Sequence, residues 1–134
     1  MITAVDTNVL IVFKADETFG TRSADVLRQC LTDGSIVASE VVWAETATIF
    51  DREAEFLEAM EALGVGYSPL DKKSALVAAH AWRRYRARGG KRERVAADFL
   101  VGAHALEQAD RLLTRDCGSY RYYFEKLRVL DPTG

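Results

Sequence analysis

The sequence predicts an α/β domain whose short, mostly parallel sheet lies between helices. Short apolar runs alternate with longer amphipathic stretches, and no Asn-Gly pair or similar signal marks a tight hairpin. Strands that are joined by helices tend to run parallel, because the crossover returns the chain to the same end of the sheet. The 134 residues show no internal repeat and no linker, so we expect a single domain over residues 1–134.

Five short apolar runs are predicted to be the strands. Each run is three or four residues long, as expected for strands in the middle of a small domain, and most of them are bounded by polar or turn-forming residues. The last run ends before Pro132, which cannot donate a hydrogen bond to a sheet. The predicted strands are Ile2–Val5, Ile36–Ala38, Tyr67–Leu70, Leu112–Thr114 and Leu127–Leu130.

Helices are predicted where apolar residues recur every three or four positions between recognisable start and stop signals. In residues 21–32 the apolar face is Ala24, Leu27, Cys30 and Leu31. Ser39 is a candidate N-cap, and glycines end several of the stretches. The predicted helices are Val9–Phe13 and residues 21–32, 40–50, 56–63, 71–88 and 95–109.

Composition excludes several classes of protein. Hydrophobic residues make up 49% and charged residues 28% of the chain, as in an ordinary globular domain. No apolar run approaches the roughly 20 residues needed to cross a bilayer, and the N-terminus does not resemble a signal peptide. We therefore expect a cytoplasmic protein without membrane contact. Cys30 and Cys117 lack metal-ligand spacing, and the net charge of −2 indicates no particular partner.

Two acidic residues follow directly on predicted strands. Asp6 ends the first apolar run, and Asp116 lies just beyond Leu112–Thr114. Because the carboxyl ends of parallel strands meet at one edge of a sheet, these two acids can lie together, where ligands bind in open α/β sheets. Taken singly, each of them could instead cap a short helix or begin a turn.

Two further acids fall on helix faces that should be apolar. Glu45 shares its face with Val41 and Ile49, and Asp98 shares its face with Val101 and Ala105. An unpaired carboxylate on an inward face is costly, and neither face supplies a Lys or Arg. Glu45 could instead reach a distant arginine, and Asp98 could oppose the dipole of its helix. A hard divalent cation, Mg²⁺ or Mn²⁺, would account for all four acids together.

Four segments of the chain stand in a recognisable order and spacing: "VDTNVLI", "SEVVWAET", "ADFLVGAHALEQADRLLTRD" and "YRYYFEKLRVLDP". Together they resemble the PIN-domain ribonucleases, and specifically the toxins of type II toxin–antitoxin pairs of the VapC kind. The resemblance covers nearly the whole chain. It implies a three-layer PIN-like domain and places the acidic residues of the family on Asp6, Glu45, Asp98 and Asp116.

The resemblance implies a metal-dependent ribonuclease that hydrolyses RNA phosphodiester bonds with Mg²⁺ or Mn²⁺ and leaves 5′-phosphate and 3′-hydroxyl ends. Asp6, Asp98 and Asp116 are the expected metal ligands, and Glu45 is expected to be a ligand or to orient the attacking water. Thr114 matches a hydroxyl position of the family, and Asn8 matches a polar position beside the first acid; we expect both to contact the substrate. Many relatives carry another Asp two residues after the last one. Gly118 stands there in this chain, which puts a strong second metal site in doubt.

The expected partners are the RNA substrate and a small antitoxin protein, in a homodimer or a toxin–antitoxin hetero-oligomer. Basic residues crowd the stretch "RRYRARGGKRER", where Arg83, Arg86 and Arg88 are candidate phosphate contacts, although the stretch also fits a solvated helix end. The aromatic stretch from Tyr120 to Phe124 suits either base stacking or the packing of a C-terminal helix. An apolar groove is expected near Phe56, Leu57 and Met60, where core packing is the competing interpretation.

Other classes of protein remain open from the residues alone. A PIN nuclease with a housekeeping role would carry the same acids. A non-catalytic RNA-binding α/β module would not need Glu45 and Asp98 on inward faces. A haloacid-type phosphatase usually shows Asp-x-Asp at the first strand, where this chain has "DTN", and a receiver domain would place a Lys at a late strand end, where this chain has "TRD".

Overall fold

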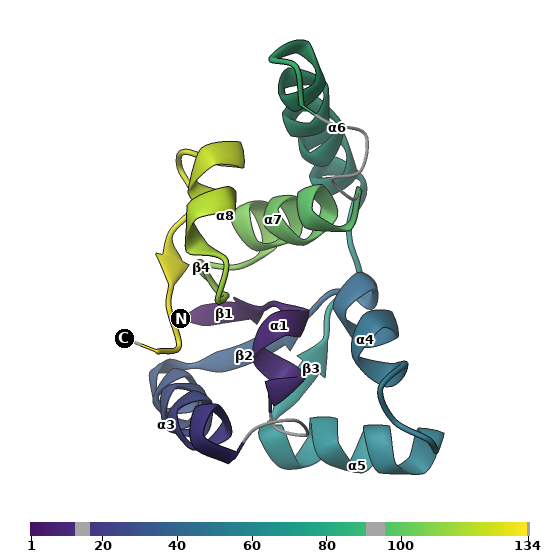
Figure 1. Cartoon of the computed structure of the whole chain (residues 1–134), viewed down its shortest axis with the longest axis vertical. Helices are drawn as coiled ribbons and strands as arrows, with labels where there is room; N and C mark the ends of the chain where they lie inside the picture. The colour runs from purple at the N-terminus through teal and green to yellow at the C-terminus, as the bar shows by residue number, and fades with distance from the viewer. Residues whose placement is uncertain (13–16, 91–95, 134) are drawn as a thin grey trace.

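The computed structural model of the protein describes residues 1–12, 17–90 and 96–133. Its centre is a five-stranded sheet in the order β3-β2-β1-β4-β5, and each neighbouring pair of strands is parallel (Figure 1). The predicted α/β class with a short parallel sheet is confirmed. The strands are β1 (Ile2–Val5), β2 (Ser35–Ala38), β3 (Val65–Tyr67), β4 (Arg111–Leu113) and β5 (Val129–Leu130).

The third strand differs most from its predicted position. It was expected at Tyr67–Leu70, but it begins at Val65, directly after the helix-ending Gly64. Gly64 adopts a positive φ of 72°, which allows the helix to stop and the strand to begin without a linker. The Ser68 amide still donates to Ala38 of β2, but Pro69 has no amide hydrogen to donate, and the Leu70 amide donates to the Glu40 carboxylate instead of to a strand.

The helices follow the predicted order, with their ends shifted by a few residues. The first helix was predicted at Val9–Phe13 but begins earlier, because the Asp6 carboxylate caps it by accepting from the Thr7 amide. Its predicted end at Phe13, like Val95 at the start of a later predicted helix, lies outside the described residues. The helices are α1 (Thr7–Leu10), α3 (Glu17–Asp33), α4 (Glu40–Ala47), α5 (Glu53–Leu63), α6 (Lys72–Ala87), α7 (Ala96–Gln108) and α8 (Cys117–Tyr123).

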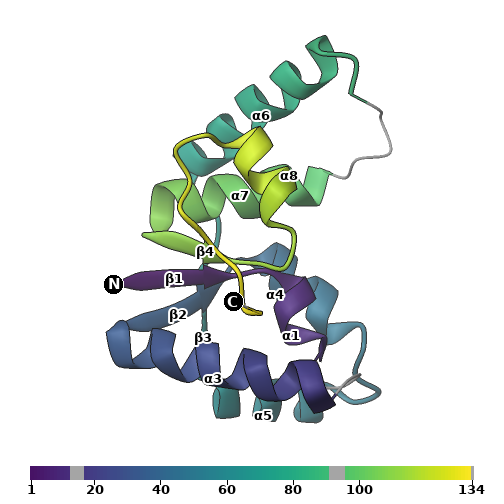
Figure 2. The ribbon, with the colours of Figure 1, turned by 60° about the vertical axis from the view of Figure 1, so that its left-hand side comes forward.

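Helices cover both faces of the sheet, which gives the three layers predicted from the sequence. On one face α3 lies against β2 and α5 lies against β3; on the other, α7 lies against β1 and β4 (Figure 2). The helices α6 and α8 pack on α7 and form the outer part of that side. In the described part of the chain, no helix is both long and apolar enough to span a membrane.

The middle strands carry the buried core and lead into the polar site. Ala4 and Val5 of β1 and Leu112 and Leu113 of β4 are almost completely buried. The chain turns polar as soon as each of these strands ends, at Asp6 after β1 and at Thr114 after β4. The parallel register pairs Val5 with Leu113, so these two polar ends lie side by side.

Candidate active site

Asp6 is a buried carboxylate held by several donors at the end of β1. Its side chain is 8% exposed. One carboxylate oxygen, Oδ1, accepts from the Thr7 amide at 2.8 Å. The other, Oδ2, accepts from the Thr114 hydroxyl at 2.9 Å and from the Asn8 amide group at 3.4 Å. Burial raises the pKa of Asp6, the charge of Glu45 adds to that effect, and the hydrogen bonds oppose it.

The Thr114 hydroxyl connects Asp6 to the segment that carries Asp116. It donates to Asp6 and accepts from the backbone amide of Asp116 at 3.1 Å. Asn8 lies alongside, with its Nδ2 atom 3.2 Å from the Thr114 hydroxyl and its Oδ1 atom accepting from the Arg115 amide at 3.0 Å. Thr114 and Asn8 therefore connect Asp6 to the segment of Arg115 and Asp116 through hydrogen bonds, and their contact with substrate stays a prediction.

Tyr120 is a member of the site that the sequence did not single out. It lies on α8 and is 1% exposed. Burial raises the pKa of its hydroxyl far above the ordinary value of 10, and the charges of Asp6, Asp98 and Asp116 raise it further. The charges of three of the four predicted acids thus act on one buried hydroxyl, and these acids come from the end of β1, from α7 and from the residue before α8.

The remaining two acids occupy different environments. Asp98 is half-buried in the first turn of α7, and Val101 and Ala105, which share its helical face, are buried. Glu45 was expected to be buried, and this is wrong: its side chain is exposed. The reason is that α4 lies beside the short helix α1, which leaves one side of α4 open to solvent. Glu45 still reaches the site, because the Thr7 hydroxyl donates to its Oε1 atom at 2.8 Å.

The carboxylates of the site suit a hard divalent cation, although their side chains do not form a closed coordination sphere. Among the residues that the structure describes, no three carboxylate, imidazole or thiol groups lie close enough together to be a ready metal site. Mg²⁺ and Mn²⁺ use a few carboxylates and keep several waters, so loosely spaced oxygen donors suit them better than they suit zinc. Asp6, Asp98 and Asp116 around the buried Tyr120 hydroxyl are such a set.

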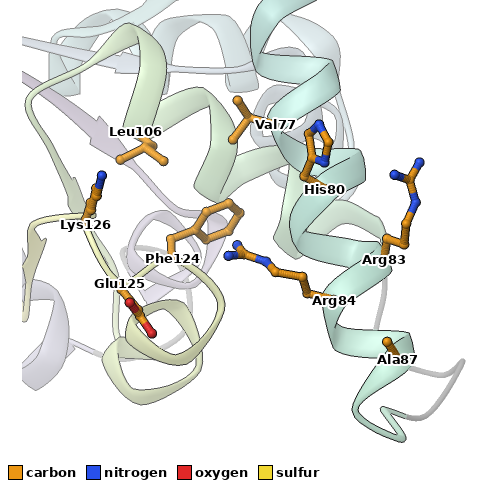
Figure 3. Close-up of a pocket in the computed structure, with 9 residues that line it drawn as sticks. All are labelled: Val77, His80, Arg83, Arg84, Ala87, Leu106, Phe124, Glu125 and Lys126. Carbon is orange, nitrogen blue, oxygen red and sulfur yellow. The ribbon is translucent and has the colours of Figure 1, made fainter.

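The predicted basic contacts divide between different places on α6. Arg83 lines a groove of about 630 Å³ together with Arg84 and Lys126, and the apolar side chains of Val77, Leu106 and Phe124 also line it (Figure 3). Arg86 lies over the ring of Trp82, 5.6 Å from its centroid. Arg88 is exposed near the end of the helix, and the other basic residues of this stretch, Lys91, Arg92 and Arg94, lie outside the described residues.

The aromatic stretch of the C-terminal part is mainly a packing element. Tyr120, Tyr123 and Phe124 are buried, whereas Tyr122 is exposed. The ring of Tyr123 packs against Phe99 of α7, with 4.7 Å between the centroids. Packing of α8 on α7 therefore accounts for most of this stretch, and it is the packing that brings the Tyr120 hydroxyl to the acids.

Comparison with known proteins shows the family of the chain. The profile of the PIN domain matches residues 3–125, and the chain belongs to the PIN-domain family. No curated protein sequence matches the chain significantly.

Solved structures with the same fold include chains of three complexes. VapBC-1 from nontypeable Haemophilus influenzae is 21% identical, with full coverage of both chains and a TM-score of 0.78. VapBC2 from Rickettsia felis, bound to a DNA fragment from its promoter, is 15% identical over 98% of both chains, with a TM-score of 0.76. FitAcB from Neisseria gonorrhoeae is 23% identical over 98% of both chains, with a TM-score of 0.69. At these identities the likeness concerns the fold.

Proposed function

We propose that this protein is a metal-dependent endoribonuclease and the toxin of a toxin–antitoxin pair. The observation that carries the proposal is the meeting of Asp6, Asp98 and Asp116 around one buried hydroxyl, at the carboxyl ends of β1 and β4 in a PIN domain. A purely structural role gives no reason for three carboxylates from distant parts of the chain to surround one buried hydroxyl, because like charges repel and the burial of a carboxylate is costly.

The chemistry follows from the donors. Asp6, Asp98 and Asp116 would hold Mg²⁺ or Mn²⁺, which would supply Lewis-acid chemistry at the scissile phosphate and a water of lowered pKa. Thr114 and Asn8 keep the Asp6 carboxylate in place through their hydrogen bonds. Glu45 is exposed at the edge of the site, where it can accept a hydrogen bond from the attacking water and orient it.

A cleavage assay on single-stranded RNA tests this mechanism. Cleavage is expected with Mg²⁺ or Mn²⁺ and is expected to stop when EDTA is added. Asp98→Asn should abolish it, because the amide is close in shape but a poorer ligand. Glu107→Gln is the matched control on the same helix, since it loses a carboxylate that pairs with Lys73 away from the acids. Full activity in EDTA, or in Asp98→Asn, would contradict the proposal.

A second surface suits the expected protein partner. Trp43, Phe56, Leu57 and Tyr67 line an open hollow of about 520 Å³ between α4, α5 and β3. Leu57 is 48% and Tyr67 57% exposed, whereas Phe56 is mostly buried. Met60, predicted to belong to this groove, is instead a core residue with 2% exposure and belongs to the main hydrophobic cluster. The antitoxin is proposed to anchor an apolar side chain here.

The toxin role is tested in cells. Because the proposed enzyme cuts RNA in the cytoplasm, the wild-type protein should arrest growth when it is expressed alone. Asp98→Asn should relieve the arrest. Co-expression of the antitoxin should restore growth, and Leu57→Asp should weaken that rescue by placing a charge in the hollow that receives the apolar side chain. A wild-type protein that cleaves RNA in vitro but does not affect growth would favour the alternative, a housekeeping nuclease. Binding of RNA without cleavage would favour a non-catalytic RNA-binding module.

A further inference from the structure

The hydroxyl of Tyr120 is buried, and its ring belongs to the hydrophobic core. The residue is 1% exposed, and within the described part of the chain its hydroxyl makes no hydrogen bond. A buried hydroxyl that makes no hydrogen bond lowers stability, and replacement by phenylalanine would remove that cost. A tyrosine at this position therefore calls for an acceptor, and the groups around it are the carboxylates of the site.

Asp6 is the acceptor that best suits this hydroxyl. Among the three acids its charge acts most strongly on Tyr120, and the two groups are close enough for the hydroxyl to lower the pKa of Asp6. The carboxylate has about four lone-pair positions. The Thr7 amide and the Thr114 hydroxyl take one on each oxygen, and the Asn8 contact at 3.4 Å is long. Asp6 can therefore accept from one more donor and still offer a lone pair to a cation.

The position of Tyr120 on α8 links it to Asp116 as well. The backbone amide of Tyr120 donates to the Asp116 carbonyl at 3.4 Å, so the two residues are one helical turn apart and lie on the same side. The turn that places the Asp116 carboxylate at the site thus also places the phenol. A single rigid element carries one acid of the site and a donor that reaches another.

We propose that Tyr120 is a positioning residue of the acid site: its hydroxyl donates to the Asp6 carboxylate and, with Thr114, fixes the plane of that carboxylate so that a lone pair faces the cation shared with Asp98 and Asp116. This inference rests on the proposed metal-dependent function. Groups that hold a metal ligand in place often matter nearly as much as the ligand itself. The ring of Tyr120 serves the core, and only the hydroxyl serves the site.

The test is the affinity for Mn²⁺, measured by electron paramagnetic resonance without any substrate. Tyr120→Phe keeps the ring and loses only the hydroxyl, so its dissociation constant for Mn²⁺ should rise about tenfold or more. Tyr122→Phe is the control, because it loses an exposed hydroxyl from the same helix and should bind Mn²⁺ like the wild type. Circular dichroism and thermal unfolding show that both variants are folded. A folded Tyr120→Phe protein with wild-type affinity would overturn the inference, since a packing role leaves metal affinity unchanged.

Two further measurements keep the outcome decisive. If Tyr120→Phe does not fold, the Tyr122→Phe protein, which keeps Tyr120, is titrated with Mn²⁺. Its tyrosine absorption should shift as the Tyr120 hydroxyl bonds to the Asp6 carboxylate. An unchanged spectrum would overturn the inference. Asp98→Asn separates this inference from the proposed function. If Asp98→Asn binds Mn²⁺ as the wild type does, the metal site itself is refuted, whereas normal binding by Tyr120→Phe alone refutes only the role of the hydroxyl.

Discussion

The Thr114 hydroxyl donates to Asp6 Oδ2 at 2.9 Å, and both residues are buried although 108 positions separate them in the chain. This bond joins the ends of β1 and β4, where the sheet gives way to the acid site. The Thr114 hydroxyl oxygen also accepts from the Asp116 amide, so this one hydroxyl orders two of the three proposed metal ligands.

Thr114→Val should therefore weaken both the fold and the site. Valine has nearly the same shape but leaves the buried Asp6 carboxylate without one of its donors, so we expect a loss of about 1–3 kcal/mol in the free energy of unfolding. Urea denaturation measures the loss, and cleavage of RNA should fall with it. Thr114→Ser keeps the hydroxyl and should retain most of both. Equal stability of the valine variant would show that the bond contributes nothing.

Glu45→Gln should separate catalysis from stability. Glu45 is exposed and contacts the Thr7 hydroxyl, so the substitution should change the free energy of unfolding by less than about 0.5 kcal/mol. If Glu45 orients the attacking water, the rate of RNA cleavage should fall roughly 100-fold. Glu53→Gln, an exposed substitution at the start of α5, should leave the rate unchanged. An unaltered rate in Glu45→Gln would reduce Glu45 to a partner of Thr7.

The fold could be predicted because its signals are local. Asp6 as a cap and Gly64 as a helix end can be recognised from a few neighbouring residues. The meeting of Asp6 and Asp116 could be predicted as well, because parallel strands bring their carboxyl ends to one edge. Strand ends such as that of β3 were harder, since a run of three residues is decided by its pairing with β2.

The rest of the site depends on tertiary packing that no local pattern carries. In sequence Tyr120, Tyr122 and Tyr123 look alike, and only the packing of α8 on α7 buries the first and exposes the second. Glu45 shows the opposite case. Its helical face looks inward by periodicity, but the neighbour it meets is the single turn of α1, which leaves its side chain in solvent.

Gly102→Ala should destabilise the protein by loosening α7 from the chain after α8. A Cβ at Gly102 would collide with the ring of Phe124, a buried residue. Overpacking costs about 1–3 kcal/mol, and the better helix propensity of alanine returns at most about 1 kcal/mol, so a net loss near 1 kcal/mol is expected in urea denaturation. Gly118→Ala is the control, because nothing lies within 4 Å of its Cβ. A stable Gly102→Ala protein would mean that the ring moves aside.

Reversing Arg83, Arg86 and Arg88 to Glu should weaken the binding of single-stranded RNA. Each lost phosphate contact reduces the slope of log affinity against log salt by about 0.7, because fewer counterions are released. Binding is measured in the Asp98→Asn background, where the RNA is not cut. An unchanged slope would show that these arginines face solvent only.

The control for charge reversal replaces three arginines outside α6 with Glu. Arg28 and Arg52 form exposed ion pairs with Asp25 and Glu55, and Arg22 is exposed on α3. Reversing them changes the net charge by the same amount as in the test variant. If both variants lose the same slope, the effect comes from the total charge of the protein and not from α6. The control residues are Arg22, Arg28 and Arg52.

The last prediction concerns His104, which is buried on α7, the helix that carries Asp98. Its Nε2 atom lies 3.0 Å from the Ser68 hydroxyl. Burial lowers the pKa of His104 below its ordinary value of 6.5, and the hydrogen bond to Ser68 and the charges of Glu40 and Asp71 only partly oppose this. The unfolded chain therefore binds a proton more readily than the folded chain, and the stability that His104 contributes is present above pH 6.5 and is lost as the pH falls below that value.

The free energy of unfolding should thus fall more steeply between about pH 7 and about pH 5 in the wild type than in His104→Gln. One proton can account for at most about 1.4 kcal/mol per pH unit. Both proteins share the same carboxylates, so their contribution cancels in the comparison, and glutamine can keep a hydrogen bond to Ser68. His80→Gln removes the exposed histidine of α6 and should keep the wild-type slope, because His104 remains. If His104→Gln and the wild type show the same slope in urea denaturation, His104 does not couple the stability of α7 to pH.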